Sequence, residues 1–173
     1  MDREQLRSLQ APLRARYGAE PPAALVTLRA EGELGSEEIS CSVQTGRALV
    51  EAGLHPASGG DGSLACSGDM LLQALVACAG VTLRSVATNR GIRVAGMVHA
   101  EGDLDFRGIL GVEAQAPAGF TAIRLRFDIE SDASPEALKA LLDATERYCT
   151  VYQTLRHPPE LSVSLAGGER SPG

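Results

Sequence analysis

DMLLQALVACAGVTLRSVATNRG, residues 69–91, is the stretch that decides the fold of this chain. It predicts a long helix whose middle is apolar all round, because leucine, valine, alanine and cysteine occupy every face. A helix of that kind lies at the centre of a fold or at a subunit interface. Ser67 is the expected N-cap, Asp69 suits the positive end of the helix dipole, and Gly91 suits the C-terminal cap.

The segments before this helix alternate between apolar and polar residues with a period of two, which predicts strands. The alternation covers 26–30 and 39–43, and a third short strand is expected over 47–51. A glycine-rich loop, HPASGGDGSLACSG (55–68), then leads into the helix. It lacks the GK[ST] of a phosphate loop, so we interpret it as a loop that needs unusual backbone angles.

Strands and a second helix follow the long helix. The expected elements are, in order, a strand over 92–100, a turn region with a short edge segment over 102–111, a strand over 123–129, a helix over 134–157 and a last strand over 161–165. Ser134 is the N-cap of that helix, with Pro135 in its first turn, and Pro158 ends it. Strands grouped before helices favour an α+β fold over a doubly wound parallel sheet.

The N-terminal residues 2–17 predict a separate amphipathic helix, in which leucines recur at three- and four-residue steps. Pro12 lies inside that pattern and is expected to bend or break the helix. We therefore divide the chain into an N-terminal helical extension (1–20), one domain (21–166) and a disordered tail (167–173).

The composition excludes several classes of protein. Acidic residues outnumber basic ones by 22 to 16, which argues against a nucleic-acid binder, since such a protein needs a basic face for phosphates. No stretch reaches the roughly 18 consecutive apolar residues of a membrane span, and the N-terminus carries no apolar signal region, so we expect a cytoplasmic protein without a membrane partner. The histidines are far apart and no CxxC occurs, so no metal site is expected.

Two of the four cysteines, Cys78 and Cys149, fall at helical positions that should face a common interior. Each is either a small buried hydrophobe, as free cysteine often is, or one half of a redox pair. An unperturbed thiol titrates near pH ~8.5, and burial raises its pKa further. A reactive Cys78 therefore needs a positive charge held by a carboxylate. Arg47 and Arg29 are candidates for the charge and Asp69 for the carboxylate.

The other two cysteines carry weaker signals. Cys41 lies on the apolar face of its predicted strand and is expected in the core. Cys66 lies in the loop before the long helix. It is either incidental or an alternative partner for the oxidised form of Cys78 or Cys149.

Two segments resemble the OsmC/Ohr family, named for osmotically inducible protein C and the organic hydroperoxide resistance protein. They are GGDGSLACSGDMLLQALVACAGVTLRSVATNRGI (59–92) and ERYCTVYQTLRHPPELSVSL (146–165), each with a cysteine in the family's context. The chain departs from Ohr and OsmC proper at Ala79, where they have Phe, at Thr150, where they have Pro, and at Gly68, where Ohr has Glu. These departures indicate a divergent OsmC-like branch.

The resemblance implies an α+β fold with antiparallel sheets around two central helices, in an intertwined homodimer with its sites at the subunit interface. It also implies reduction of small organic hydroperoxides, with Cys78 as the peroxidatic thiolate and Cys149 as the resolving thiol. Asp69 matches the acidic position of one branch, and Arg47 is our choice for the activating arginine. No bound cofactor is implied. The reductant is an external dithiol, which in Ohr-like members is a lipoylated protein.

A second hypothesis comes from a different class of protein. The chain would be a non-catalytic dimer of the same fold that binds a small hydrophobic ligand or acts in stress without using its thiols. The two hypotheses differ in whether the pKa of Cys78 is depressed, and in whether Cys149 lies within disulfide reach of it.

Overall fold

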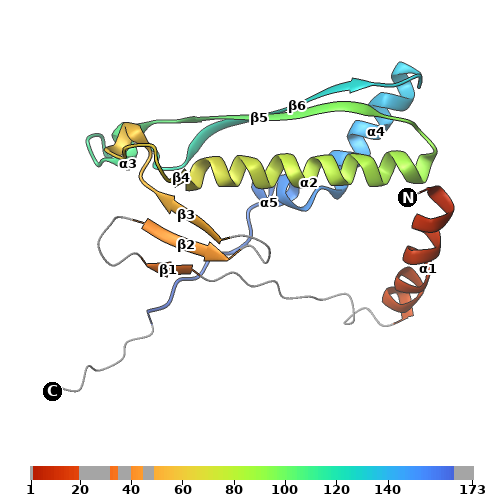
Figure 1. Ribbon diagram of the computed structural model, residues 1–173, viewed down its shortest axis with the longest axis horizontal. Coiled ribbons are helices and arrows are strands. Elements are labelled where there is room, and N and C mark those ends of the chain that lie inside the picture. The colour runs from red at the N-terminus through yellow and green to blue at the C-terminus, as the bar shows by residue number, and fades with distance from the viewer. Residues whose placement is uncertain (1, 20–31, 35–39, 45–48, 166–173) are drawn as a thin grey trace.

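A computed structural model describes residues 2–19, 32–34, 40–44 and 49–165 (Figure 1). The expected strand over 26–30, the tail after residue 166, and the side chains of Arg29 and Arg47 lie outside the described residues. So does the side chain of Cys41. The described part is a mixed α and β structure with two small sheets, and this confirms the predicted α+β class.

The predicted long helix is α2, Ser67–Arg90, and Gly91 ends it with φ 71°, in the left-handed region. Ser67 is not its N-cap. Cys66 has the extended backbone of that position, with no side-chain capping bond, and Ser67 is the first helical residue. The reason is that Ala65–Cys66 form a short strand, β4, whose extended backbone runs directly into the helix.

One face of α2 is buried rather than the whole circumference. Four residues spaced one turn apart form that face: Leu75, Ala79, Leu83 and Ala87. Opposite it, the side chain of Val81 is 72% exposed. By length and composition alone α2 is apolar enough to cross a membrane, a test that the core helix of a soluble protein also passes. Its buried face packs on β5, α4 and α5 of the same chain.

The first sheet has the order β1-β2-β3-β4. Its strands are β1 (Gly32–Leu34), β2 (Ser40–Gln44), β3 (Leu49–Gly53) and β4. The first three strands pair antiparallel. β4 pairs parallel to β3, so the expectation of antiparallel sheets is wrong for this pair of strands. A 3-10 turn, η2 (Pro56–Ser58), lies in the glycine-rich loop between β3 and β4.

The second sheet is a long antiparallel hairpin of β5 (Ala95–Leu104) and β6 (Phe120–Glu130), which runs along α2 (Figure 1). The expected strand over 92–100 begins later, because the N–H of Ile92 still bonds to the last turn of α2. The expected turn region with a short edge segment, over 102–111, is a strand in its first part. Gly102–Leu104 continue β5, and a short helix, α3 (Phe106–Ile109), follows.

The second predicted helix is two helices, α4 (Pro135–Tyr148) and α5 (Thr150–Arg156). Ser134 caps α4 as expected, and its side chain accepts a bond from the N–H of Ala137. The break falls at Cys149, whose backbone is extended (φ −74°, ψ 106°). The one-helix prediction over 134–157 is therefore wrong at this residue, where the chain turns so that α5 also packs on α2.

Two predictions at the ends of the chain are also corrected. Residues 161–165 are not a strand, because no described strand pairs with them, and Leu161, Val163 and Leu165 are at least 85% exposed. At the other end, α1 (Arg3–Ala19) is not broken at Pro12, so of the two expected effects of this proline the break is wrong. It packs against the C-terminal part of α2 (Figure 1).

Candidate functional site

The structure brings Cys78 and Cys149 together, one from the middle of α2 and one from the junction of α4 and α5. Cys149 is 1% exposed and packs with Leu75 and Ala79 on the buried face of α2. Cys78 is partly buried at the edge of that cluster, and both cysteines are free thiols. The pair thus combines one partly buried cysteine with one that is fully buried.

The break at Cys149 leaves the first N–H groups of α5 without partners inside the helix, as at every helix start. The carbonyl of Cys149 accepts the first bond of α5, from the N–H of Gln153. The N–H groups of Thr150 and Val151 are directed at the sulfur of Cys78, and that of Tyr152 at the sulfur of Cys149. No side-chain hydrogen bond caps α5 at Cys149, but these N–H groups lower the pKa of the thiols they face.

These donors affect the pKa of Cys78. Burial raises the pKa of the thiol, and hydrogen bonds to its sulfur act in the opposite direction, from the N–H of Val151, the thiol of Cys149, the N–H of Thr150 and the hydroxyl of Thr82. The hydrogen bonds prevail, and the pKa of Cys78 lies below its ordinary value. Donors that stabilise a thiolate in this way make the sulfur a better nucleophile at neutral pH.

The pKa of Cys149 is shifted in the opposite direction, upward. Its burial raises its pKa, and a negative charge on the neighbouring Cys78 raises it further, although the N–H of Tyr152 partly compensates. Because the two thiols interact, the pair titrates as a unit, and Cys78 loses its proton first. The arrangement therefore combines one thiol that ionises more readily with one that keeps its proton to higher pH.

Sequence reasoning missed these donors and expected an arginine in their place. No charged side chain of the described residues contributes to the lowered pKa of Cys78. One signal was available: Thr82 follows Cys78 by four residues, so the two side chains share a helix face. The sequence could not indicate the backbone N–H donors. They reach Cys78 because the chain turns at Cys149, which no local pattern predicts.

The other predicted site residues are not brought to the pair. Asp69 is exposed in the first turn of α2, and nine residues of helical rise place it about 13 Å along the axis from Cys78. Cys66, twelve residues before Cys78, is about 18 Å from it by the same rise. It is therefore out of disulfide reach in this conformation. Arg47, the predicted activating residue, lies outside the described residues.

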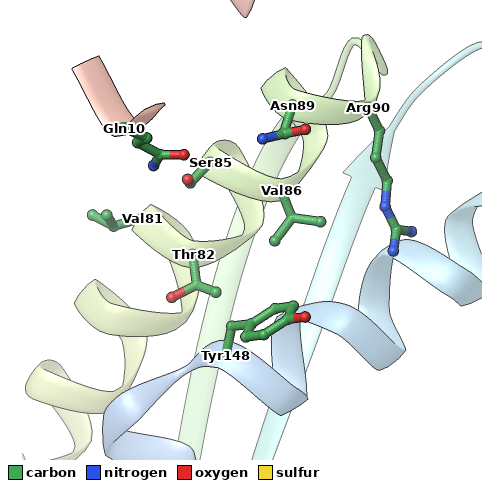
Figure 2. Close-up of a pocket in the computed structure, with 8 residues that line it drawn as sticks. All are labelled: Gln10, Val81, Thr82, Ser85, Val86, Asn89, Arg90 and Tyr148. Atoms are coloured by element: carbon green, nitrogen blue, oxygen red, sulfur yellow. The ribbon is translucent and has the colours of Figure 1, made fainter. Parts of the chain in front are cut away.

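A pocket of about 460 Å³ lies along the exposed side of α2, and neither Cys78 nor Cys149 lines it (Figure 2). Thr82, a donor to Cys78, and Tyr148, the neighbour of Cys149, lie at one end of it. At the other end are Asn89 of α2 and Gln10 of α1. The remaining lining residues are Val81, Ser85, Val86 and Arg90. A small amphipathic molecule in this pocket would contact Thr82 and Tyr148, which are neighbours of the two cysteines.

A second pocket, of about 520 Å³, is lined by residues of α2, β6 and α5, with Leu75 among them. It is mostly apolar, with Leu71, Phe120 and Leu155 among its lining residues, and Arg156 is the one charged group that lines it. Within the described part of the chain, no group of three or more His, Cys, Asp or Glu side chains is placed to hold a metal ion.

Comparisons with known proteins agree with this fold. The family model described as OsmC-like protein matches residues 60–164. An OsmC-like protein from Mycoplasma pneumoniae superposes with a TM-score of 0.64 at 17% identity, over 77% of this chain and 89% of the other. An organic hydroperoxide resistance protein from Elizabethkingia anophelis gives 0.58 at 16% identity, over 78% and 91%. One from Legionella pneumophila gives 0.56 at 18%, over 78% and 92%. No curated protein matches the sequence.

Proposed function

This chain belongs to the OsmC-like protein family, and we propose that it is a thiol-dependent peroxidase that reduces organic hydroperoxides. The observation that carries the proposal is the asymmetry of the cysteine pair. Cys78 is partly accessible with a lowered pKa, and it touches Cys149, which is buried with a raised pKa. A peroxidatic thiol must be ionised and reachable, whereas a resolving thiol must be close and keep its proton until it reacts.

The reaction begins with attack of the Cys78 thiolate on the terminal peroxide oxygen of ROOH. The O–O bond breaks, the sulfur becomes a sulfenic acid, and the released alkoxide takes a proton to leave as ROH. The sulfur of Cys149 then attacks the sulfenic sulfur. A disulfide forms, and the hydroxyl leaves as water with the proton of the Cys149 thiol. An external dithiol reduces this disulfide by exchange and becomes a disulfide itself. We propose a lipoylated protein as that dithiol and the cytoplasm as the location.

The hydrogen bonds to Cys78 support the first of these steps. At pH 7 an unperturbed thiol is only about 3% thiolate, so any lowering of the pKa increases the reactive fraction. Thr82 and the N–H groups of α5 provide this lowering. Arg47 and Asp69 remain our candidates for a further contribution. Because Asp69 is about 13 Å from Cys78 along α2, it would act on the thiol only through another group, such as an arginine.

We also propose that the protein is a homodimer with its sites at the subunit interface. Apolar side chains on the open face of α2 and in the C-terminal segment support this, since Val81 is 72% exposed and Val163 is 99% exposed. Apolar side chains of this kind are typical of a surface that a partner covers. Light scattering should give the mass of two chains, and Val81→Arg should shift it toward one. A monomeric wild-type protein would contradict the proposal.

The second pocket favours one alternative function, a non-catalytic dimer that binds a small hydrophobic ligand. Its apolar lining and its size suit such a molecule. In that case the cysteine pair would be idle.

Free-thiol counting with intact mass separates the two functions. One equivalent of cumene hydroperoxide should rapidly remove two thiols from the wild-type protein and leave a mass two hydrogens lower. Cys78→Ser should prevent the loss, and Cys149→Ser should gain one oxygen as a trapped sulfenic acid. Cys66→Ser is the matched control and should still lose two thiols. Survival of all thiols, while a control peroxidase consumes the reagent, would contradict peroxidase function.

A further inference from the structure

Glu146, in the last turn of α4, makes three contacts to α5 across the break at Cys149. Its carboxylate accepts a hydrogen bond from the hydroxyl of Tyr152 at 3.2 Å and lies 3.8 Å from the guanidinium of Arg156. Its carbonyl is one of the last in α4, where no partner inside the helix is left, and it accepts the side-chain amide of Gln153 at 2.7 Å. One residue of α4 therefore contacts three residues of α5.

Arg156 completes a network with the two side chains that face it. Its guanidinium donates to the hydroxyl of Tyr152 at 3.2 Å, and the same hydroxyl donates to Glu146. The side chains of Glu146 and Arg156 are 46% and 58% exposed, so the ion pair alone contributes little stability. Among the ion pairs of the described residues, however, it is the one that joins two helices.

Tyr152 connects this network to the two thiols. Its backbone N–H is directed at the sulfur of Cys149, and the N–H of the preceding residue, Val151, is directed at the sulfur of Cys78. The side chains of Tyr152, Val151 and Leu155 pack on the apolar cluster that holds both cysteines. The hydroxyl at the centre of the network thus belongs to the same helical turn as the N–H donors.

α5 depends on such contacts for its orientation. It has only seven residues, and a helix of that length is not stable on its own. Apolar packing is not directional, so it fixes the place of α5 on α2 better than its tilt and rotation. Hydrogen bonds weaken steeply as their angle departs from linear. The polar contacts with Glu146 are therefore suited to fixing the direction in which the first N–H groups of α5 point.

We propose that Glu146 is a positioning residue for the thiol pair. Through Tyr152 and Arg156 it holds the first turn of α5 in the orientation that directs backbone N–H groups at the two sulfurs. The inference rests on the proposed peroxidase function and adds to it a residue that touches neither sulfur. Glu146 would act on the reaction only through the ionisation of Cys78.

Glu146→Ala should move the alkylation midpoint of Cys78 to higher pH by about half a unit, which lowers the thiolate fraction at pH 7 about threefold. Tyr152→Phe, which removes only the hydroxyl, should give a similar shift. Glu146→Gln keeps an acceptor for that hydroxyl and should lie closer to the wild type. Lys139→Gln breaks an ion pair with Asp143 inside α4 and is the matched control, with an unchanged midpoint.

The pH profile separates positioning from a general loss of structure. Well above the midpoint the thiol is fully ionised, so Glu146→Ala should then be alkylated at the wild-type rate. An unchanged midpoint in both Glu146→Ala and Tyr152→Phe would overturn the proposal. So would a rate that changes by the same factor at every pH.

The same measurements distinguish this proposal from the peroxidase function. Alkylation needs no peroxide, so the midpoints decide the role of Glu146 even if the protein consumes no hydroperoxide. If the protein is a peroxidase, its rate with cumene hydroperoxide at pH 7 should fall about threefold in Glu146→Ala, in step with the thiolate fraction. A shifted midpoint without any peroxide consumption by the wild type would contradict the peroxidase alone.

Discussion

The backbone N–H of Val151 is directed at the sulfur of Cys78 and is the largest of the interactions that lower the pKa of this thiol. Val151 lies in the first turn of α5, and Cys78 lies in the middle of α2. The contact therefore depends on the docking of one helix against another. Any change that moves α5 should appear first as a change in the ionisation of Cys78.

The two thiols should titrate in a fixed order. Because the pKa of Cys78 is lowered and that of Cys149 is raised, alkylation by iodoacetamide should begin at Cys78 and at a lower pH than for a cysteine in a short peptide. Cys149→Ala removes one donor to Cys78, so it should move the Cys78 midpoint to higher pH. Peptide mapping at each pH measures both effects, and alkylation of Cys149 first would contradict the order.

Thr82→Val removes a hydroxyl donor from Cys78 and keeps the shape of the side chain. The expected result is a rise in the Cys78 pKa of up to about one unit, since a neutral hydrogen bond contributes about 0.5–1.5 kcal/mol. The alkylation midpoint measures the rise. Thr88→Val, on the same helix and without a role in the pKa of Cys78, should leave the midpoint unchanged.

Gln153 holds α5 to α4 across the break at Cys149, since its side-chain amide donates to the carbonyl of Glu146 at 2.7 Å. Gln153→Ala should loosen α5, which should raise the pKa of Cys78 and speed hydrogen exchange of the Val151 amide. Thr154→Ala, exposed on the same helix, is the control. Faster exchange with an unchanged Cys78 midpoint would show that α5 is not the source of the lowered pKa.

Leu141 supports the packing of α4 on α2, because its side chain is 0% exposed in a cluster with Leu83, Ala87 and Val94. Leu141→Ala should reduce the free energy of unfolding by about 2–5 kcal/mol, through lost burial and the cavity left behind. Leu110→Ala, at a residue that is 56% exposed, should change it by less than about 0.5 kcal/mol. Urea unfolding measures both, and equal losses would contradict the assigned core.

The sequence by itself determined the elements whose signals are local. The apolar run of α2, its terminal Gly91 and the cap at Ser134 depend on neighbours in the same segment, so they could be predicted without knowing the fold. The positions of Cys78 and Cys149 in the predicted helices likewise indicated that the two thiols face one interior, although Cys149 lies at the break between α4 and α5. The cysteine contexts of 59–92 and 146–165 were enough to indicate the family.

Only the tertiary structure decided how the site works. The chain breaks at Cys149 without a proline or a glycine, so no local signal marked the residue where α5 begins. The N–H donors of α5 reach Cys78 through the packing of two helices that are far apart in the sequence. Periodicity identifies apolar positions but not which of them find partners, and for this reason it could not distinguish the buried Leu75 from the exposed Val81.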